Sequence, residues 1–87
     1  MIEKLMELAK NSYSPYSHFR VATIVIMKDG TEFSGVNVET SSPAAGICAE
    51  RNAMLNMITN GENEIRRVLA IMPEEEQALP VVHAGNL

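Results

Sequence analysis

Cys48 and Glu50, two residues apart, have side chains that could carry chemistry in this chain of 87 residues. They fall in the first turn of a predicted helix, where the helix dipole and free backbone N–H groups favour a thiolate that acts as a metal ligand or a nucleophile. Arg51 lies three residues from Cys48 on the same helical face and could screen the thiolate charge. The residues alone leave ordinary alternatives open, namely a buried structural cysteine, a solvated glutamate and a surface arginine.

A second pair of polar residues, Asn37 and Glu39, lies in a predicted strand that runs from about residue 32 to residue 39. Side chains two residues apart project from the same face of a strand, so these two share a face. Asp29-Gly30 precedes the strand and is typical of a hairpin turn. We therefore expect the pair to follow a hairpin and to stand on one surface of a sheet.

Hydrophobic periodicity predicts the elements that must position these residues. Apolar residues at three- and four-residue steps predict a short N-terminal helix, and a mostly apolar run from Phe19 to Met27 predicts a strand buried on both faces. A helical stripe after residue 48 ends at Gly61, which is typical of a helix C-cap, and a third strand follows at 67–72. The order helix, strand, strand, helix, strand predicts an α/β fold with helices packed against a sheet.

Composition narrows the functional class. The chain has 46% hydrophobic and 21% charged residues, as globular domains do, and its net charge of -4 argues against a nucleic-acid partner, which needs a basic face. One cysteine cannot form an intramolecular disulfide, and charged residues within the first ten positions argue against a signal peptide. No segment approaches transmembrane length, so we expect no membrane partner and a cytoplasmic location.

Three strings of this sequence resemble the cytidine deaminase family and occur in the order and spacing of that family. They are Ser14-Pro15-Tyr16-Ser17-His18-Phe19-Arg20-Val21, Gly35-Val36-Asn37-Val38-Glu39 and Cys48-Ala49-Glu50-Arg51. The likeness extends over nearly all of residues 1 to about 72. It implies a single α/β domain of helix, sheet and helix layers with a mixed sheet, of which residues 1–80 form the N-terminal part.

The resemblance also implies roles for single residues. Cys48 would bind zinc, Glu50 would carry protons, and Asn37 and Glu39 would hold the ribose hydroxyls of a pyrimidine nucleoside. Phe19 would lie against the pyrimidine ring, although a plain core position fits this phenylalanine too. The implied reaction is hydrolytic deamination of cytidine or deoxycytidine at C4, in which zinc lowers the pKa of its bound water. The resemblance further implies a homo-oligomer.

The second zinc-binding motif of the family, Pro-Cys-Gly-Ala-Cys-Arg-Gln, has no counterpart in this sequence. Its place holds Pro80-Val81-Val82-His83-Ala84-Gly85-Asn86-Leu87. One DNA sequence for the motif and the residue after it, CCT TGT GGT GCA TGC AGG CAA CTT A, encodes this same tail once one base of the proline codon is removed. We therefore hypothesise that residues 81–87 are an aberrant tail produced by a one-base deletion, with Val81 and Ala84 at the positions of two lost zinc thiolates.

Zinc is the implied cofactor, yet a catalytic zinc site needs about three protein ligands and the motif leaves Cys48 alone. His83 falls between the two lost positions and is interpreted as a product of the shifted frame, and His18 as a surface or hydrogen-bonded side chain. We expect no useful deaminase activity from this chain. Two other interpretations stay open: a metal-free nucleoside-binding or oligomerisation module, and an inert pseudogene product.

Two structural expectations follow from the differences between this sequence and the family pattern. Loss of the family's last strands and helices would leave an open edge at the strand near Val68 to Ile71 and uncovered apolar surface. Ala22-Thr23 stands where the family usually has Gly-Ala, so the larger side chains are expected to crowd the base pocket.

Overall fold

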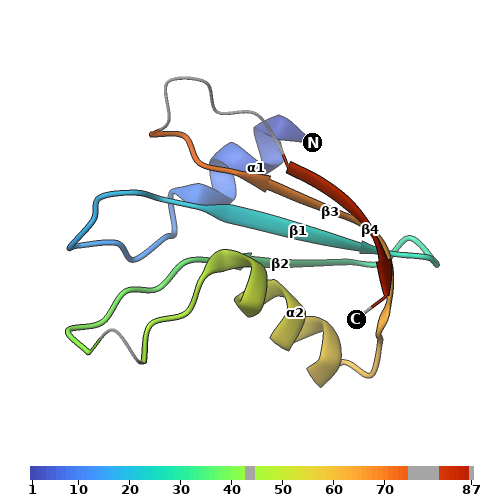
Figure 1. The fold of residues 1–87 in the computed structure, drawn as a ribbon. Coiled ribbons are helices and arrows are strands. Elements are labelled where there is room, and N and C mark those ends of the chain that lie inside the picture. The colour runs from blue at the N-terminus through green and yellow to red at the C-terminus, as the bar shows by residue number, and fades with distance from the viewer. Residues whose placement is uncertain (43–44, 75–80, 87) are drawn as a thin grey trace.

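The computed structural model describes residues 1–42, 45–74 and 81–86. This part of the chain has two helices and one four-stranded sheet, and Figure 1 shows their arrangement. In chain order the elements are α1 (Ile2–Ala9), β1 (Ala22–Met27), β2 (Glu32–Val36), α2 (Ala49–Thr59), β3 (Glu64–Ile71) and β4 (Val81–Asn86). The strand order is β2-β1-β3-β4, and the three pairings between these strands are antiparallel. The α/β fold is confirmed, with an antiparallel sheet in the described residues where a mixed one was expected.

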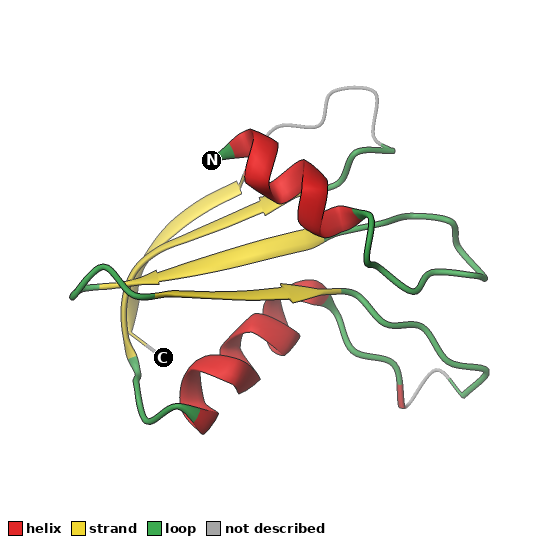
Figure 2. Ribbon diagram, turned by 180° about the vertical axis from the view of Figure 1, so that it is seen from behind, coloured by secondary structure: helices red, strands yellow, loops and turns green. Residues whose placement is uncertain are grey.

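The two helices cover opposite faces of the sheet, as Figures 1 and 2 show from the two sides. One buried cluster packs α1 against Ala22 and Ile24 of β1. The other packs α2 against Val25 and Met27 of the same strand. Because alternate residues of a strand face opposite sides, β1 is buried on both faces, as its apolar sequence predicted. The expected layers of helix, sheet and helix are confirmed.

β1 begins at Ala22, three residues later than the sequence predicted. The residues before it are bonded by a side chain of the neighbouring segment. The Val21 N–H donates to Asn37 Oδ1 at 2.9 Å, and the Phe19 carbonyl accepts from Asn37 Nδ2 at 2.8 Å. A side chain thus replaces the backbone ladder where β1 was expected to start.

α2 lies close against β2 at Gly35. A Cβ atom added there would lie 2.7 Å from the Ala49 carbonyl oxygen and closer still to a backbone nitrogen of α2. Beside this contact, Asn52 Nδ2 donates to the Val36 carbonyl at 3.0 Å. Only glycine allows this approach, which places the first turn of α2 next to the end of β2.

The end of α2 agrees with the signal in the sequence. α1 ends at Ala9, and α2 ends at Thr59 with Gly61 just beyond it in the left-handed region, at a φ of 82°. This confirms Gly61 as the residue that terminates the helix. In the part of the chain that the structure describes, neither helix is long and apolar enough to cross a membrane.

β4 covers the outer edge of β3. Its antiparallel pairing begins at Ala70↔Val81 and ends at Glu64↔Asn86. The expectation of an open edge on β3 is therefore wrong, because the tail supplies backbone partners to this strand. Within the described residues, β2 and β4 are the edges of the sheet.

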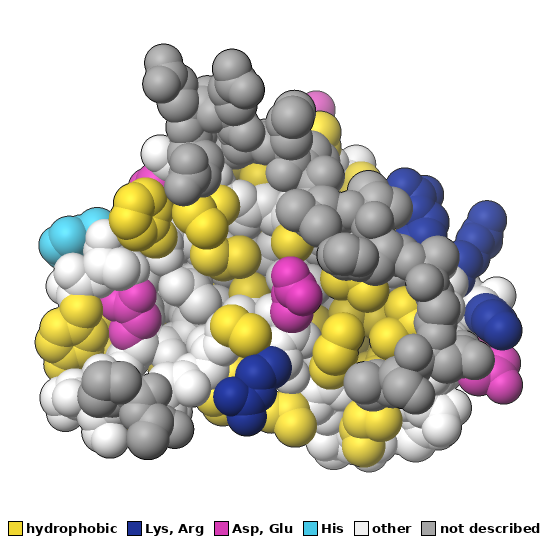
Figure 3. Space-filling model, in the orientation of Figure 1, with side chains coloured by type: hydrophobic (Ala, Val, Ile, Leu, Met, Phe, Trp, Pro, Cys, Tyr) yellow, Lys and Arg dark blue, Asp and Glu magenta, His cyan; other side chains and the backbone are white. Residues whose placement is uncertain are grey.

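The uncovered apolar surface expected at the strand near Val68 to Ile71 is not observed, because the apolar residues 68–71 are buried. Large apolar side chains are exposed on α2 instead. Leu55 and Ile58 of α2 are each 51% exposed. Figure 3 shows hydrophobic side chains gathered on one face of the molecule, with single acidic side chains set among them.

Candidate functional site

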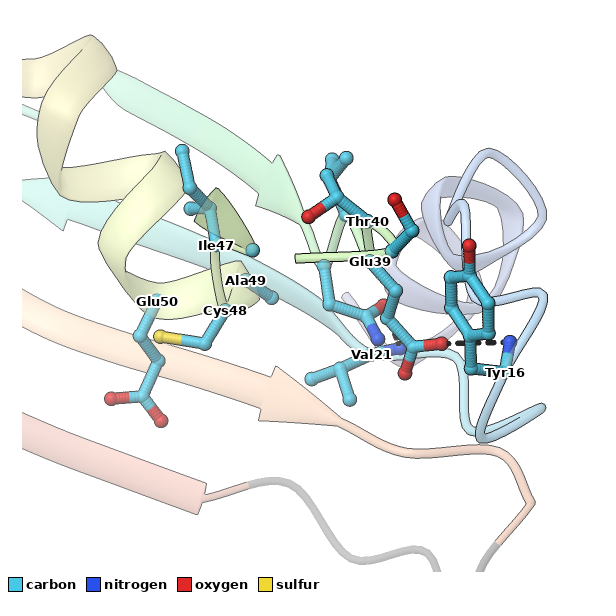
Figure 4. A pocket seen from close by; sticks show the side chains of 12 residues that line it. Tyr16, Val21, Glu39, Thr40, Ile47, Cys48, Ala49 and Glu50 are labelled. Atoms are coloured by element: carbon cyan, nitrogen blue, oxygen red, sulfur yellow. Dashed lines mark hydrogen bonds between the residues drawn. The ribbon is translucent and has the colours of Figure 1, made fainter. Parts of the chain in front are cut away.

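A pocket of about 700 Å³ lies between the residues that follow β2, the loop before β1 and the start of α2 (Figure 4). Asn37, Glu39, Cys48 and Glu50, four of the six predicted site residues, line it. Figure 4 shows Cys48 and Glu50 at one end and Glu39 beside Tyr16 at the other. The fold therefore brings two separate motifs of the sequence to one cavity.

Val38 connects the segments that build this pocket. It forms a parallel bridge with Tyr13 and an antiparallel bridge with Ile47. The Val38 N–H donates to the Ile47 carbonyl at 2.9 Å, and the Glu39 N–H donates to the Tyr13 carbonyl at 2.7 Å. β2 ends at Val36, before its predicted end, because the chain there exchanges β1 for these two new neighbours.

Cys48 is the N-cap of α2, with extended backbone angles of φ -77° and ψ 160°, and its side chain makes no capping hydrogen bond. The residue is exposed, which excludes the interpretation of a buried structural cysteine. Glu50 lies half-buried in the first turn of the helix, as predicted. Both side chains border the same end of the pocket, so one ligand can reach both.

Three hydrogen bonds hold the Asn37 side chain. Its Oδ1 accepts from the Ser12 hydroxyl and from the Val21 N–H at 2.9 Å, and its Nδ2 donates to the Phe19 carbonyl at 2.8 Å. An amide oxygen has two lone pairs and an amide nitrogen carries two hydrogens. Among the described residues, one N–H of Asn37 therefore has no partner and is left for a ligand.

The loop before β1 binds the Glu39 carboxylate. Its Oε1 accepts from the N–H groups of Tyr16 and Ser17 at 3.1 and 3.0 Å, and its Oε2 accepts from the Ser17 hydroxyl. These hydrogen bonds, the Ser17 hydroxyl first, and the nearby His18 lower the pKa of Glu39 against the opposing effect of desolvation. Glu39 is therefore ionised at neutral pH, and Oε2 keeps a lone pair that no described residue uses.

Arg20 and Glu74 fasten the same loop to the end of β3. The Arg20 N–H donates to Glu74 Oε2 at 3.0 Å, and the Arg20 Nε donates to Oε1. Desolvation would raise the pKa of Glu74, but the hydrogen bonds and the charge of Arg20 outweigh it and the net direction is downward. The ion pair thus helps to fix the loop at the mouth of the pocket.

Two predicted site residues do not line the pocket. The Phe19 side chain is 45% exposed, and only its backbone contacts the site, through Asn37. Arg51 is exposed on α2 and lies outside the lining. Thr23 is buried in β1 and also outside the lining, so the expected crowding of the pocket by this side chain is not observed. The roles predicted for Phe19 and Arg51 stay predictions.

The sequence indicated no role for Ser12, two residues before the first motif string, or for Ser17 within it. Their hydroxyls bind the two residues that were predicted to hold the sugar. The available signal was their position on either side of the Ser14-Pro15 turn, where short polar side chains commonly bond to neighbouring groups. Their partners could not be named without the fold.

The residues present do not complete a catalytic zinc site. Zinc deaminases use a histidine and two cysteines or three cysteines as ligands, whereas this chain has one cysteine. Within residues 1–42 and 45–74, no three His, Cys, Asp or Glu side chains converge in a way that could hold a metal ion. The exposed Cys48 fits one ligand position, and the remaining donors do not fit.

Comparisons with known sequences identify the same family as the motif strings. Residues 1–84 match the family described as the cytidine and deoxycytidylate deaminase zinc-binding region. The cytidine deaminase of Mycoplasma genitalium is 42% identical over 65 residues, which cover 75% of this chain and 49% of that protein. A probable cytidine deaminase of Dictyostelium discoideum is 38% identical over 72 residues, covering 78% of this chain and 49% of that protein. This chain spans about half the length of these curated relatives.

Solved structures show the same relationship. A cytidine deaminase from Burkholderia pseudomallei superposes with a TM-score of 0.77 at 32% identity, over 82% of this chain and 57% of that chain. A cytidine deaminase from Mycobacterium leprae superposes with a TM-score of 0.70 at 31% identity, over 82% of this chain and 63% of that chain. By sequence and by fold, the chain belongs to the cytidine and deoxycytidylate deaminase family.

Proposed function

We propose that the pocket binds a pyrimidine nucleoside, cytidine or deoxycytidine, as part of the hydrolytic deamination that the family name denotes. The observation that carries this proposal is the meeting of Asn37 and Glu39 with Cys48 and Glu50 on one pocket. Its volume of about 700 Å³ is within the usual range for small-molecule sites. The acidic chain is compatible with an uncharged nucleoside ligand.

The two ends of the pocket have different tasks in this proposal. At one end, an N–H of Asn37 and a lone pair of Glu39, both without a partner in the described residues, bind sugar hydroxyls. Both side chains are already held by protein groups, which lowers the entropy lost on binding. At the other end, Glu50 would carry a proton between water and the base only in a site that also held zinc. Cys48 is one thiolate of a zinc site that the other residues do not complete.

The 87-residue chain by itself is then a nucleoside-binding protein without deaminase activity. Zinc lowers the pKa of bound water to about 7, an advantage on the order of 10 kcal/mol toward hydroxide that Glu50 alone does not replace. Val81 and Ala84, which stand at the two expected thiolate positions, have no metal-binding group.

The tail, residues 81–87, is in this proposal the product of a shifted reading frame. The support is the agreement of all its residues with a one-base deletion in the family motif. The nucleotide sequence tests it. Insertion of one base at codon 80 should open a frame that encodes Pro-Cys-Gly-Ala-Cys and continues beyond codon 87, and a frame without those cysteine codons contradicts the idea.

A second candidate function is oligomerisation by a metal-free module. Leu55 and Ile58 favour it, because exposed apolar side chains on one helix can form a subunit contact. Light scattering tests for the homo-oligomer, and a monomer at all concentrations would count against it. A place in pyrimidine salvage and a cytoplasmic location belong to the proposal of nucleoside binding. Cell fractionation tests the location.

The direct test of binding is calorimetry of the purified chain with cytidine, together with measurement of its zinc content. We expect saturable binding at about one site per chain and zinc well below one ion per chain. Glu39→Ala should abolish binding, whereas Asn60→Ala, at the far end of α2, should not. Absence of cytidine binding in the wild-type chain would contradict the proposed function.

A further inference from the structure

The groups of Asn37 and Glu39 that remain free define what each residue can do for a ligand. Among the described residues, Asn37 has one unused N–H and Glu39 has one unused lone pair on Oε2. A hydroxyl both donates and accepts, so these two groups complement a sugar hydroxyl. The direction of Oε2 therefore decides whether its lone pair faces the ligand.

The Ser17 hydroxyl is the protein partner of Glu39 Oε2. It donates to Oε2, and it accepts from the Phe19 N–H at 3.1 Å. Because the Phe19 N–H approaches a lone pair of this hydroxyl, the hydroxyl hydrogen is left to point at Glu39. Ser17 thus fixes one of the two lone-pair positions of Oε2 and leaves the other.

The turn around Ser17 presents its amide and its hydroxyl to the same carboxylate. The His18 N–H donates to the Ser14 carbonyl at 3.0 Å, and His18 has a left-handed φ of 62°. Successive N–H groups, those of Tyr16 and Ser17, then reach one oxygen of Glu39, an arrangement that favours anions. Ser17 is the residue that contacts both carboxylate oxygens.

We propose that Ser17 is a positioning residue for nucleoside binding, whose hydroxyl holds the Glu39 carboxylate so that one lone pair of Oε2 is presented to a sugar hydroxyl. The inference rests on the proposed function, in which Glu39 holds the sugar. The lowered pKa of Glu39, to which the Ser17 hydroxyl contributes most, agrees with a carboxylate that is kept ionised for this contact.

Calorimetry with two ligands tests the role of Ser17. Cytidine has base and sugar, whereas 1-methylcytosine has the base alone. We expect Ser17→Ala to weaken cytidine binding about tenfold, as for one lost hydrogen bond to a charged group, and to leave 1-methylcytosine binding unchanged. Ser17→Thr keeps the hydroxyl and should bind both ligands as the wild type does. Ser34→Ala removes a hydroxyl from β2, outside the pocket lining, and should change neither affinity.

A Glu39→Gln background separates positioning from a general structural effect. If Ser17 acts through Glu39, Ser17→Ala should add less than about twofold to the loss in this background. No loss with Ser17→Ala, equal loss for both ligands, or a full tenfold loss in the Glu39→Gln background would overturn the positioning role and leave the proposed function standing. A wild-type chain that binds no cytidine would instead overturn the proposed function, and the role of Ser17 with it.

Discussion

The pocket wall, by which we mean residues 37–39 and the first turn of α2 (residues 49–52), and the tail strand β4 are held to the molecule by different kinds of contact. At the wall, the side chains of Asn37, Glu39 and Asn52 bind backbone groups of distant segments. β4 pairs with β3 through its backbone, which a strand of almost any sequence without proline can do. The wall therefore depends on the identity of its residues, and the tail pairing does not. The tail sequence, which we propose is the product of a shifted frame, therefore pairs at the edge of the sheet without supplying a cysteine.

The largest effect on the free energy of unfolding is expected at Gly35, where β2 and α2 are in closest contact. Gly35→Ala should cost about 3 kcal/mol or more in the free energy of unfolding, because its Cβ would meet the backbone of α2. Gly30→Ala is the matched control: Gly30 has a φ of 93° but no neighbour within 4 Å, so its cost should be about 1 kcal/mol. Urea unfolding of both variants measures the difference, and equal costs would contradict the account of the α2–β2 contact.

A second prediction concerns the side chain that joins three segments of the wall. Asn37→Ala leaves the Val21 N–H and the Phe19 carbonyl without their partner and should cost about 2 kcal/mol of stability, with loss of cytidine binding. Asn60→Ala removes an exposed amide at the end of α2 and should cost less than about 0.5 kcal/mol. Thermal unfolding and calorimetry measure both quantities, and a stable Asn37→Ala protein would show that the wall does not depend on this residue.

Removal of the tail, unlike a change in the pocket wall, should lower stability without loss of cytidine binding. A chain that ends at Pro80 loses the antiparallel pairs between β3 and β4 and should be less stable by on the order of 1–2 kcal/mol. Its affinity for cytidine should stay within about twofold, because the side chains of Asn37 and Glu39 are held by groups of residues 12–21 and not by the tail. Hydrogen exchange should show faster exchange of β3 amides in the shortened chain. A tenfold loss of affinity would mean that the two regions are coupled.

The smallest effects are expected from pH. The pKa of Glu39 is lower in the folded chain than its usual value, so its stabilisation is present above that usual value and is lost as pH falls through the folded-state pKa. Desolvation first, and then the charge and hydrogen bond of Asp29, raise the pKa of Glu62, which therefore opposes folding near neutral pH.

Melting curves of two variants measure these signs. Near pH 7, Glu39→Gln should lower the melting temperature and Glu62→Gln should raise it, the latter by less than about 2 °C. Both differences should shrink toward acid pH, where the wild-type carboxyls are also neutral. Differences that stay constant with pH would show that charge is not their cause.

The sequence predicted those parts of the fold that depend on local pattern. The apolar run before Met27 indicated a strand buried on both faces, and Gly61 indicated the end of α2, and both are confirmed. Four of the six site residues predicted from the motif strings also line the pocket. These features follow from side-chain spacing and from residue types with one conformational use.

Other features depend on contacts between distant segments and were beyond the sequence. Val38 ends the pairing of β2 with β1 because two loops bind it, and no local pattern marks this. β4 was unforeseen because its pairing uses backbone groups that every strand has. The roles of Ser12 and Ser17 depend on which loop faces which strand. The antiparallel sheet likewise depends on the partner of β3 and not on the sequence of β3 itself.

The most direct test of the whole account is ammonia release from cytidine by the purified 87-residue chain, supplied with zinc and measured beside its cytidine binding. We expect saturable binding with no ammonia above the uncatalysed rate, because this chain has one cysteine where zinc deaminases use at least two. Turnover at an ordinary enzymatic rate, on the order of 1 per second or faster, would contradict it.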